Sequence, residues 1–264
     1  MGLIVLLTDF GLQDSYVGVM KGVIAGLSSD SRVIDLTHNL PPQDIRAARF
    51  SLTSSCDYFP ADTVYGIVVD PGVGTERATV AAQIQTRAGL QTVVAPDNGI
   101  LTGFAITQAV ALTDSRYWRT SVPSRTFHGR DIFAPVAAHL ANGVALGKLG
   151  RSILPEQLTQ LGMDRPVITA AGCGGIVQYI DRFGNLVTNI SGDSLAAAAW
   201  EVFICDRTVS FYATYGLAQP GQLLALIGSH GYVEVAASGA SAAAVLAAAV
   251  GTAVEVRYLE QRGK

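Results

Sequence analysis

Short, continuous apolar runs alternate with longer amphipathic stretches along the first half of the chain. Apolar runs without alternation are typical of strands covered on both faces, and the order strand, helix, strand builds a parallel sheet. The pattern predicts an α/β domain with a central, mostly parallel sheet at residues 1–160. Its last helix should begin near 129–131, because Pro135 is tolerated only in a first helical turn. The expected strands are 3–7, 33–36, 64–69, 80–84, 92–95 and 110–112, and the earlier helices are 16–27 and 43–57.

The pattern changes after residue 149. Prolines and glycine pairs interrupt the stretch up to residue 175, and short apolar runs separated by turns follow it. Such spacing favours a small antiparallel sheet or barrel. We therefore predict a domain boundary within 149–175 and a smaller, antiparallel β-barrel-like domain at 170–264. Its strands are expected at 175–180, 186–190, 201–205, 223–227, 232–235 and 253–258.

The composition argues against one class of partner and favours another. Of the 264 residues, 49% are hydrophobic and 15% are charged, so we expect large contacts between the subunits of a homo-oligomer. The net charge is −3 and no two Lys or Arg residues are adjacent. A nucleic-acid partner is therefore not expected, because it requires a basic surface.

We expect a cytoplasmic protein without a membrane span. Residues 235–254 carry no charge, but half of them are alanine, and a packed helix plus strand is favoured there. The apolar run after Met1 is too short for a signal peptide. The cysteines Cys56, Cys173 and Cys205 are widely spaced, so we interpret them as small core residues in a reducing compartment.

The stretch 68–77 delivers two charges at the end of a predicted buried strand. Asp70 follows the strand directly, Pro71 and two glycines form a tight turn, and Arg77 closes that turn. Open α/β sheets bind their ligands at this edge. One interpretation is an ion-paired turn and the other is a binding site, and the two residues alone do not decide between them.

Asp9 and Asp14 emerge from the first predicted strand at the same edge of the sheet. Either Asp14 or Ser15 is expected to cap the helix that begins at Tyr16. Asp9 lies directly at the strand end, where an acidic side chain in nucleotide sites accepts hydrogen bonds from both ribose hydroxyls. We therefore expect a ligand that contains ribose.

Two further segments bring polar side chains to this region. Asn98 lies in the turn 96–99, which also follows a strand, and it either shapes that turn or reaches the same crevice. His128 precedes the last predicted helix. A histidine beside Asp70 and Arg77 is suited to proton chemistry, whereas the four histidines lack metal-ligand spacing, so no metal is expected.

In the second half, residues 180–189 place an acid, an aromatic ring and an amide around a turn. One interpretation is a hairpin with a polar tip. The other is a binding site in which Asp181 and Asn185 hold an ammonium or carboxylate group and Phe183 packs on a flat or cationic group.

Together these segments resemble the S-adenosyl-L-methionine (SAM) hydroxide adenosyltransferase family, whose relatives include the bacterial fluorinase and chlorinase. The resemblance covers nearly the whole chain in order, and it lies in the set of motifs. The motifs are Thr8-Asp9-Phe10-Gly11 with Asp14, Val69-Asp70-Pro71-Gly72-Val73-Gly74 with Arg77, Pro96-Asp97-Asn98-Gly99, Phe127-His128-Gly129-Arg130-Asp131 and Asp181-Arg182-Phe183-Gly184-Asn185.

The resemblance implies a Rossmann-like N-terminal domain, a C-terminal barrel-like domain and a homotrimer with substrate held between neighbouring subunits. It implies attack of water or hydroxide on C5′ of the ribose of SAM, which is the substrate and not a cofactor. The family's Asp-Arg-His set falls on Asp70, Arg77 and His128. Halogenases have a tyrosine at the position of Asp70 and a serine at that of Gly129, so this chain resembles the branch that uses water.

The resemblance also implies substrate contacts in both domains. Asp9 would accept the ribose hydroxyls, Asp181 and Asn185 would hold the methionine ammonium, and Ser229 would contact the methionine carboxylate. Tyr232 and Glu234 would lie near adenine, where His230 is bulkier than the family's usual residue.

These residues agree with a hydrolysis. A sulfonium leaves as a neutral thioether, so the reaction needs an activated water in line with C5′ more than it needs an acid. We expect His128 and Asp70 to accept or orient the proton of that water, while Arg77 favours its hydroxide form. Two alternatives remain open: a non-catalytic sensor of SAM or adenosine, and a nucleoside-processing enzyme of another class such as a phosphorylase.

Overall fold

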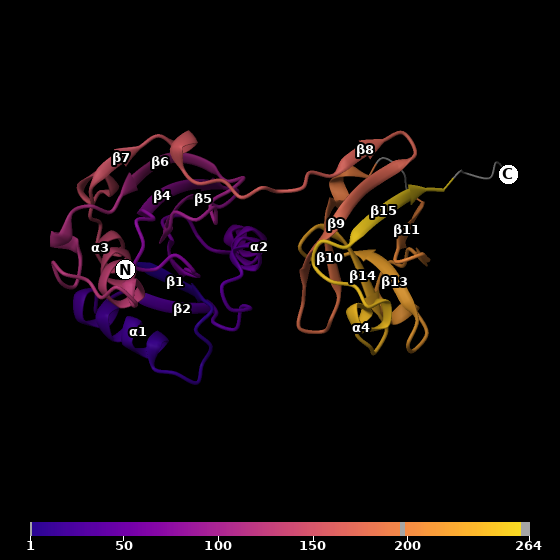
Figure 1. The fold of residues 1–264 in the computed structure, drawn as a ribbon, viewed down its shortest axis with the longest axis horizontal. Coiled ribbons are helices and arrows are strands. Elements are labelled where there is room, and N and C mark those ends of the chain that lie inside the picture. The colour runs from indigo at the N-terminus through magenta and orange to yellow at the C-terminus, as the bar shows by residue number, and fades with distance from the viewer. Residues whose placement is uncertain (1, 196–198, 260–264) are drawn as a thin grey trace. The chain divides into compact units, whose positions relative to one another are not determined.

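The computed structural model describes residues 2–195 and 199–259 of the chain. The chain divides into two compact units, Met1–Leu161 and Gly162–Lys264. The first unit combines helices with a mixed sheet, and the second consists mainly of antiparallel strands (Figure 1). This is the α/β architecture with a separate barrel-like part that the sequence predicts.

The first unit is built on one seven-stranded sheet with the order β2-β1-β3-β5-β4-β6-β7. The strands β2, β1, β3 and β5 run parallel to one another, whereas β4, β6 and β7 join the sheet in antiparallel pairs. The parallel half is therefore confirmed, and the hairpin of β4 and β5 makes the sheet mixed. The bounds are β1 Leu3–Thr8, β2 Arg32–Thr37, β3 Val64–Val68, β4 Thr79–Thr86, β5 Gly89–Pro96, β6 Ala105–Ala111 and β7 Arg151–Ile153.

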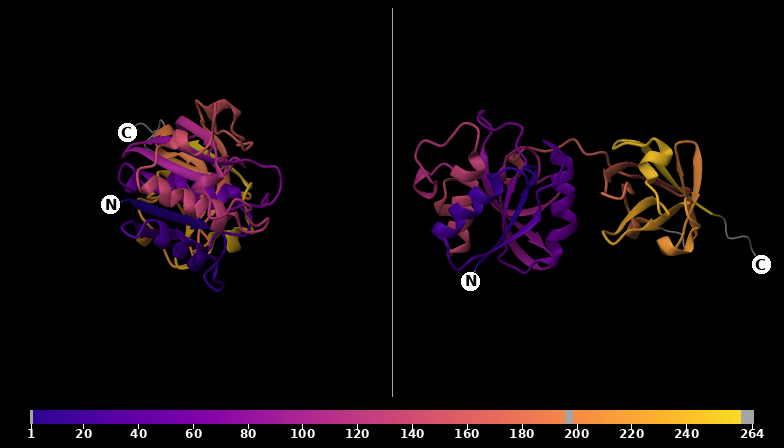
Figure 2. Two further views of the ribbon diagram at one scale, coloured as in Figure 1. Left: turned by 90° about the vertical axis from the view of Figure 1, so that its left-hand side faces the viewer. Right: turned by 90° about the horizontal axis from the view of Figure 1, so that it is seen from below.

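Helices cover both faces of this sheet, as the continuous apolar strands require. Helices α1 (Tyr16–Leu27) and α3 (Ala134–Ala141) lie together on one face, and α2 (Ile45–Ser55) lies on the other (Figures 1 and 2). Gly66 of β3 allows the close approach of α3, because a Cβ atom there would lie 3.0 Å from the Leu6 side chain and 3.9 Å from that of Ala137.

A π-helical turn over Gly129–Phe133 leads directly into α3. The helical segment thus begins at Gly129, within the predicted range. Pro135 still lies in the first turn of an α-helix, because α3 itself begins at Ala134. Such π turns are rare and are frequent at functional sites, and this one carries His128 at its start.

The second unit is an antiparallel sheet with the order β12-β11-β15-β9-β10-β14-β13, and β8 also pairs with β9. A bridge between Phe211 and Ala225 links the two ends of this order, so the sheet curls into a barrel-like form. This confirms the predicted architecture. The bounds are β8 Val167–Thr169, β9 Gly172–Ile180, β10 Leu186–Ser191, β11 Trp200–Ile204, β12 Arg207–Ser210, β13 Leu223–Ile227, β14 Tyr232–Ala237 and β15 Ala253–Tyr258.

The alanine-rich segment forms a short helix, α4 (Ala242–Leu246), followed by β15, which confirms the predicted helix plus strand. No helix of the described residues could cross a membrane. Two features differ from the sequence prediction. The short strands β7, β8 and β12 were not predicted, since they lie at sheet edges and are mostly exposed. Cys205 is exposed in the turn between β11 and β12, not in the core, whereas Cys56 and Cys173 are buried.

Candidate active site

Four segments of the first unit meet around a cavity of about 270 Å³, which we call the Asp9 cavity. Asp9 follows β1 and Asp70 lies just beyond the end of β3, so two neighbouring parallel strands deliver their carboxylates to the same edge. His128 comes from the start of the π turn. The lining of the cavity includes Asp9, Gln43, Asp70, Phe127, His128 and Gly129.

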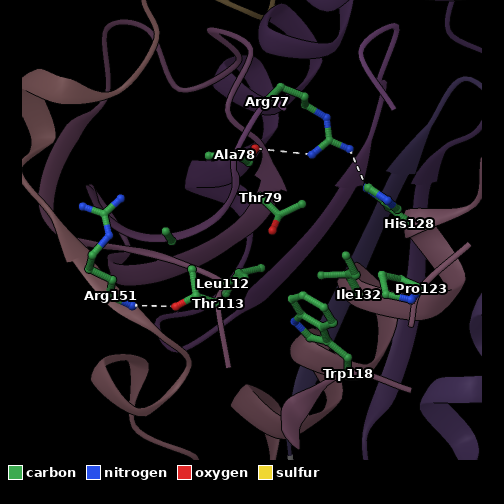
Figure 3. A pocket seen from close by; sticks show the side chains of 11 residues that line it. Arg77, Ala78, Thr79, Leu112, Thr113, Trp118, Pro123, His128, Ile132 and Arg151 are labelled. Carbon is green, nitrogen blue, oxygen red and sulfur yellow. Dashed lines mark hydrogen bonds between the residues drawn. The ribbon is translucent and has the colours of Figure 1, made fainter. Parts of the chain in front are cut away.

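Asp70, Arg77 and His128 form one hydrogen-bonded set, which we call the triad. The Arg77 guanidinium donates to both carboxylate oxygens of Asp70, with Nε at 2.6 Å from Oδ1 and Nη2 bonded to Oδ2. Nη2 also donates to Nδ1 of His128 at 2.9 Å (Figure 3). The Asp70 and Arg77 side chains are 4% and 10% exposed, so this ion pair is held away from bulk water.

The turn between Asp70 and Arg77 depends on two glycines. Gly74 has a φ of +78°, and a Cβ atom there would lie 2.3 Å from the carbonyl oxygen of Arg125. A Cβ atom at Gly72 would lie 3.2 Å from Cγ of Arg77. The guanidinium carbon of Arg77 lies 5.6 Å from the centre of the Phe133 ring, a distance typical of a cation–π contact. The turn therefore fixes the position of Arg77 as well as its charge.

The hydrogen bond from Arg77 determines the protonation state of His128. Because a guanidinium only donates, Nδ1 of His128 must accept, and the neutral ring then carries its proton on Nε2. Burial and the charge of Arg77 lower the pKa of His128 below its ordinary 6.5, against the opposing effect of Asp70 and Asp131. His128 is thus a neutral hydrogen-bond donor through Nε2 near pH 7.

Asp9 is held by the segment that follows β2. Its Oδ2 accepts a hydrogen bond from the backbone N–H of Gln43 at 2.7 Å. Gln43 has a φ of +64°, a conformation that non-glycine residues seldom adopt and that clusters at functional sites. Asp9 lines a cavity that is wide enough for part of a nucleoside.

An aromatic cluster supports the same cavity. Phe127 lies edge-on to Tyr16 and to Phe10, with ring centres 5.2 Å and 5.9 Å away. Gly129 packs tightly beneath it, since a Cβ atom there would lie 3.1 Å from the Phe127 ring and 3.1 Å from the sulfur of Met20. This wall has no room for a larger residue at position 129 unless both neighbours move.

Asp131 anchors the loop that carries His128. Its buried carboxylate accepts hydrogen bonds from Arg119 at 2.5 Å, from Arg130 at 2.7 Å and from the backbone N–H of Ser124 at 2.9 Å. Burial alone would raise the pKa of Asp131, but these donors outweigh it and hold the pKa far below the ordinary 3.8. Asp131 belongs to the motif Phe127-His128-Gly129-Arg130-Asp131, but nothing in that motif indicates that its carboxylate is fully buried.

Two other predicted site residues occupy more peripheral positions. The amide of Asn98 donates to the carbonyl of Val69 at 2.9 Å, so this side chain braces the backbone next to Asp70. Asp14 is exposed and does not line the Asp9 cavity. Ser15 holds the N-cap position of α1, but its side chain makes no capping hydrogen bond.

In the second unit, Asp181 and Asn185 bind each other around a tight turn. Oδ1 of Asp181 accepts from the backbone N–H groups of Phe183 and Asn185, both at 2.9 Å, and Oδ2 accepts from the Asn185 amide at 2.9 Å. This is the hairpin with a polar tip that the sequence allowed. The Phe183 ring is 77% exposed, so it is available for a contact outside its own unit.

A second polar cluster surrounds the buried Glu234 on β14. Its two carboxylate oxygens accept from the Tyr215 hydroxyl at 2.6 Å and pair with Nε2 of His230 at 3.0 Å. The backbone N–H of Tyr232 donates to Nδ1 of His230 at 3.1 Å, which places the proton of the neutral ring on Nε2. His230 thus donates a hydrogen bond to Glu234 through Nε2. Ser229 lies exposed on the adjoining turn.

Comparison with known families identifies both units. Residues 4–150 match the model of the SAM hydroxide adenosyltransferase N-terminal domain. Residues 175–255 match the model of the SAM hydroxide adenosyltransferase C-terminal domain. The two matches together cover most of the chain in the order that the sequence resemblance implied.

Individual relatives agree with these matches. The (R)-S-adenosyl-L-methionine hydrolase of Salinispora tropica is 39% identical over 254 residues, which cover 94% of this chain and 95% of that protein. The fluorinase of Actinopolyspora mzabensis is 27% identical over 280 residues, covering 91% and 92%. A crystal structure of an uncharacterized conserved protein from Thermotoga maritima superposes with a TM-score of 0.88 at 34% identity, covering 96% of this chain and 99% of that one.

The Asp131→Asn substitution should destabilise the first unit by roughly 2–3 kcal/mol, because it leaves hydrogen-bond donors of Arg119 and Arg130 without their charged acceptor. The partial exposure of both guanidiniums keeps the loss below that of a fully buried pair. A carboxylate with a lowered pKa stabilises the fold above its unfolded pKa. The difference from the parent protein, measured by urea denaturation, should therefore be full at pH 7 and shrink as the pH falls below about 4. An equal loss at pH 3 and pH 7 would contradict this role.

Removal of the Arg77 charge should raise the pKa of His128. The Arg77→Met substitution deletes a cation that lowers this pKa and leaves the Asp70 carboxylate, which raises it. Titration of the His128 ring by NMR should give a midpoint below 6.5 in the parent protein and a higher midpoint in the variant. His139, whose pKa is lowered by burial alone, provides an internal control that should not move.

Proposed function

The chain belongs to the SAM hydroxide adenosyltransferase family, and on that premise we propose that it hydrolyses SAM to adenosine and L-methionine, with the triad binding the nucleophile. The observation that carries the proposal is the arrangement of the triad. A buried guanidinium and a neutral imidazole are joined at one edge of a cavity that also holds a carboxylate suited to ribose.

The reaction is a displacement at C5′ of the ribose. A bond forms between the oxygen of water and C5′ while the bond from C5′ to sulfur breaks. The electron pair of that bond stays on sulfur, which turns from a sulfonium into the neutral thioether of methionine. The attacking water loses one proton, so each turnover releases one proton to solvent. No acid is needed for the leaving group, and catalysis depends on the orientation and ionisation of water.

The hydrogen-bond directions refine the role of each triad residue. Nδ1 of His128 has a single lone pair, which accepts from Arg77, so this atom cannot take a proton from water. Each oxygen of Asp70 already accepts one hydrogen bond from Arg77, which makes the carboxylate a weaker base. His128 retains a donor at Nε2. We assign Arg77 and His128 to the binding of a water that reacts in its hydroxide form, and we assign Asp70 to the orientation of Arg77. Preorganised donors of this kind stabilise developing or full negative charge strongly in a site shielded from water.

The remaining predicted residues are assigned to substrate binding. In the first unit, Asp9 binds the ribose hydroxyls, while Asn98 positions Asp70 through the Val69 carbonyl. The exposed Asp14 is assigned to the outer part of the substrate site.

The second unit would bind the rest of the molecule. Asp181, Asn185 and Ser229 are assigned to the methionine ammonium and carboxylate, and Phe183 to an apolar contact. Tyr232 and Glu234 are assigned to the neighbourhood of adenine, with His230 holding Glu234 in place. The proposal includes a homotrimer, which predicts a mass in solution three times that of the chain.

The test is turnover of SAM in ¹⁸O-water. The parent protein should release adenosine that carries the label in its 5′-hydroxyl, because water attacks C5′. The substitutions Arg77→Met and His128→Ala should each lower kcat/KM by ~100-fold or more, since each removes a donor from the bound nucleophile.

Arg116→Met is the matched control for Arg77→Met. Arg116 also binds an aspartate, Asp114, through two nitrogens, but this pair is exposed and lies outside the Asp9 cavity. Its activity should equal that of the parent protein. Tight binding of SAM without labelled adenosine would instead favour a sensor, and phosphate-dependent release of adenine would favour a phosphorylase.

A further inference from the structure

The triad also borders a second cavity, of about 320 Å³, which we call the Arg151 cavity. Arg77 lines this cavity and Asp70 lines the Asp9 cavity, while His128 lines both. The imidazole that we assign to the nucleophile is therefore accessible from two spaces. Figure 3 shows Arg77 and His128 at one end of the Arg151 cavity, with Arg151 at the other.

The Arg151 cavity has a mostly apolar lining with a few polar side chains. Thr79, the first residue of β4, follows Arg77 by two residues, and its side chain lies between the triad and the far wall (Figure 3). Thr113 and Arg151 are exposed, so the cavity opens to solvent at their end.

The proposed reaction requires such a space. Bound SAM would occupy the Asp9 cavity, of about 270 Å³, during turnover. One water must nevertheless reach the triad and one proton must leave in every cycle. Nδ1 of His128 is already engaged by Arg77 and cannot take this proton, and the ion pair with Arg77 makes Asp70 a weak base.

We propose that the Arg151 cavity is the solvent port of the triad, through which the nucleophilic water arrives and the released proton departs while substrate fills the Asp9 cavity. The inference rests on the proposed function. In balanced form, the oxygen of a water at the triad bonds to C5′ as the C5′–S pair passes to sulfur. The proton that this oxygen loses passes to water in the port and from there to bulk solvent.

The test is to narrow the port beside the triad without touching the triad. Thr79→Phe adds an aromatic ring next to Arg77, on a strand where aromatic residues are well tolerated. We expect kcat to fall by ~5-fold or more while KM for SAM stays within ~2-fold, because a step after binding is slowed. In a weakly buffered single turnover followed with a pH indicator, release of the proton should lag behind formation of adenosine. In the parent protein the two should coincide.

Thr107→Phe is the matched control, since Thr107 is an exposed strand residue on β6 that lines neither cavity. Thr113→Trp, at the exposed mouth, is a second narrowing variant that does not disturb the core. It should reproduce the lower kcat even if Thr79→Phe proves unstable. The port proposal would be overturned if a folded variant had the same kcat as the parent protein, or if only its KM rose. Absence of labelled adenosine from the parent protein would instead overturn the proposed function.

Discussion

The first unit depends on the placement of one guanidinium. Arg77 is nearly buried, and a cation in that position is tolerated because Asp70 neutralises it with two hydrogen bonds. The same guanidinium donates to His128 and thereby fixes the tautomer of the ring. The glycines at 72 and 74, the Phe133 ring and the Asn98 brace all serve to hold this group in place. The hydrogen bonds of the Arg77 side chain thus hold together the 70–77 loop, the end of β3 and the π turn.

This bonding pattern changes the chemical role of the histidine. In many hydrolases a carboxylate orients an imidazole that then removes a proton from the nucleophile. Here a cation lies between the carboxylate and the imidazole, so the ring is kept neutral and donates. An arrangement of donors around a buried cation favours an anionic nucleophile over a neutral one. The water-using and halide-using branches of the family would then share one requirement, which is the binding of a small anion opposite a sulfonium.

Much of this arrangement follows from local pattern. The strand ends at Asp9 and Asp70 were predictable because parallel strands deliver their carboxyl ends to one edge. The start of α1 at Tyr16 also agreed with its position after a turn. The antiparallel hairpin of β4 and β5 was harder to predict, because an apolar run does not show whether a strand is parallel or antiparallel to its neighbour. Strands β7, β8 and β12 are only three or four residues long, and they are defined by pairing with a neighbour. Three features arise from three-dimensional packing and could not be predicted from sequence spacing. They are the direction of the hydrogen bond between Arg77 and His128, the burial of Asp131 and the Arg151 cavity.

Gly129 has a consequence for the history of the fold. The resemblance places a serine of the halogenases at this position, yet any side chain here meets both Met20 and Phe127. Phe127 is in turn packed against Phe10 and Tyr16. A serine at position 129 would require Met20 and Phe127 to shift by a few tenths of an ångström. A lineage that exchanged water for halide would therefore have had to adjust this aromatic wall together with position 129.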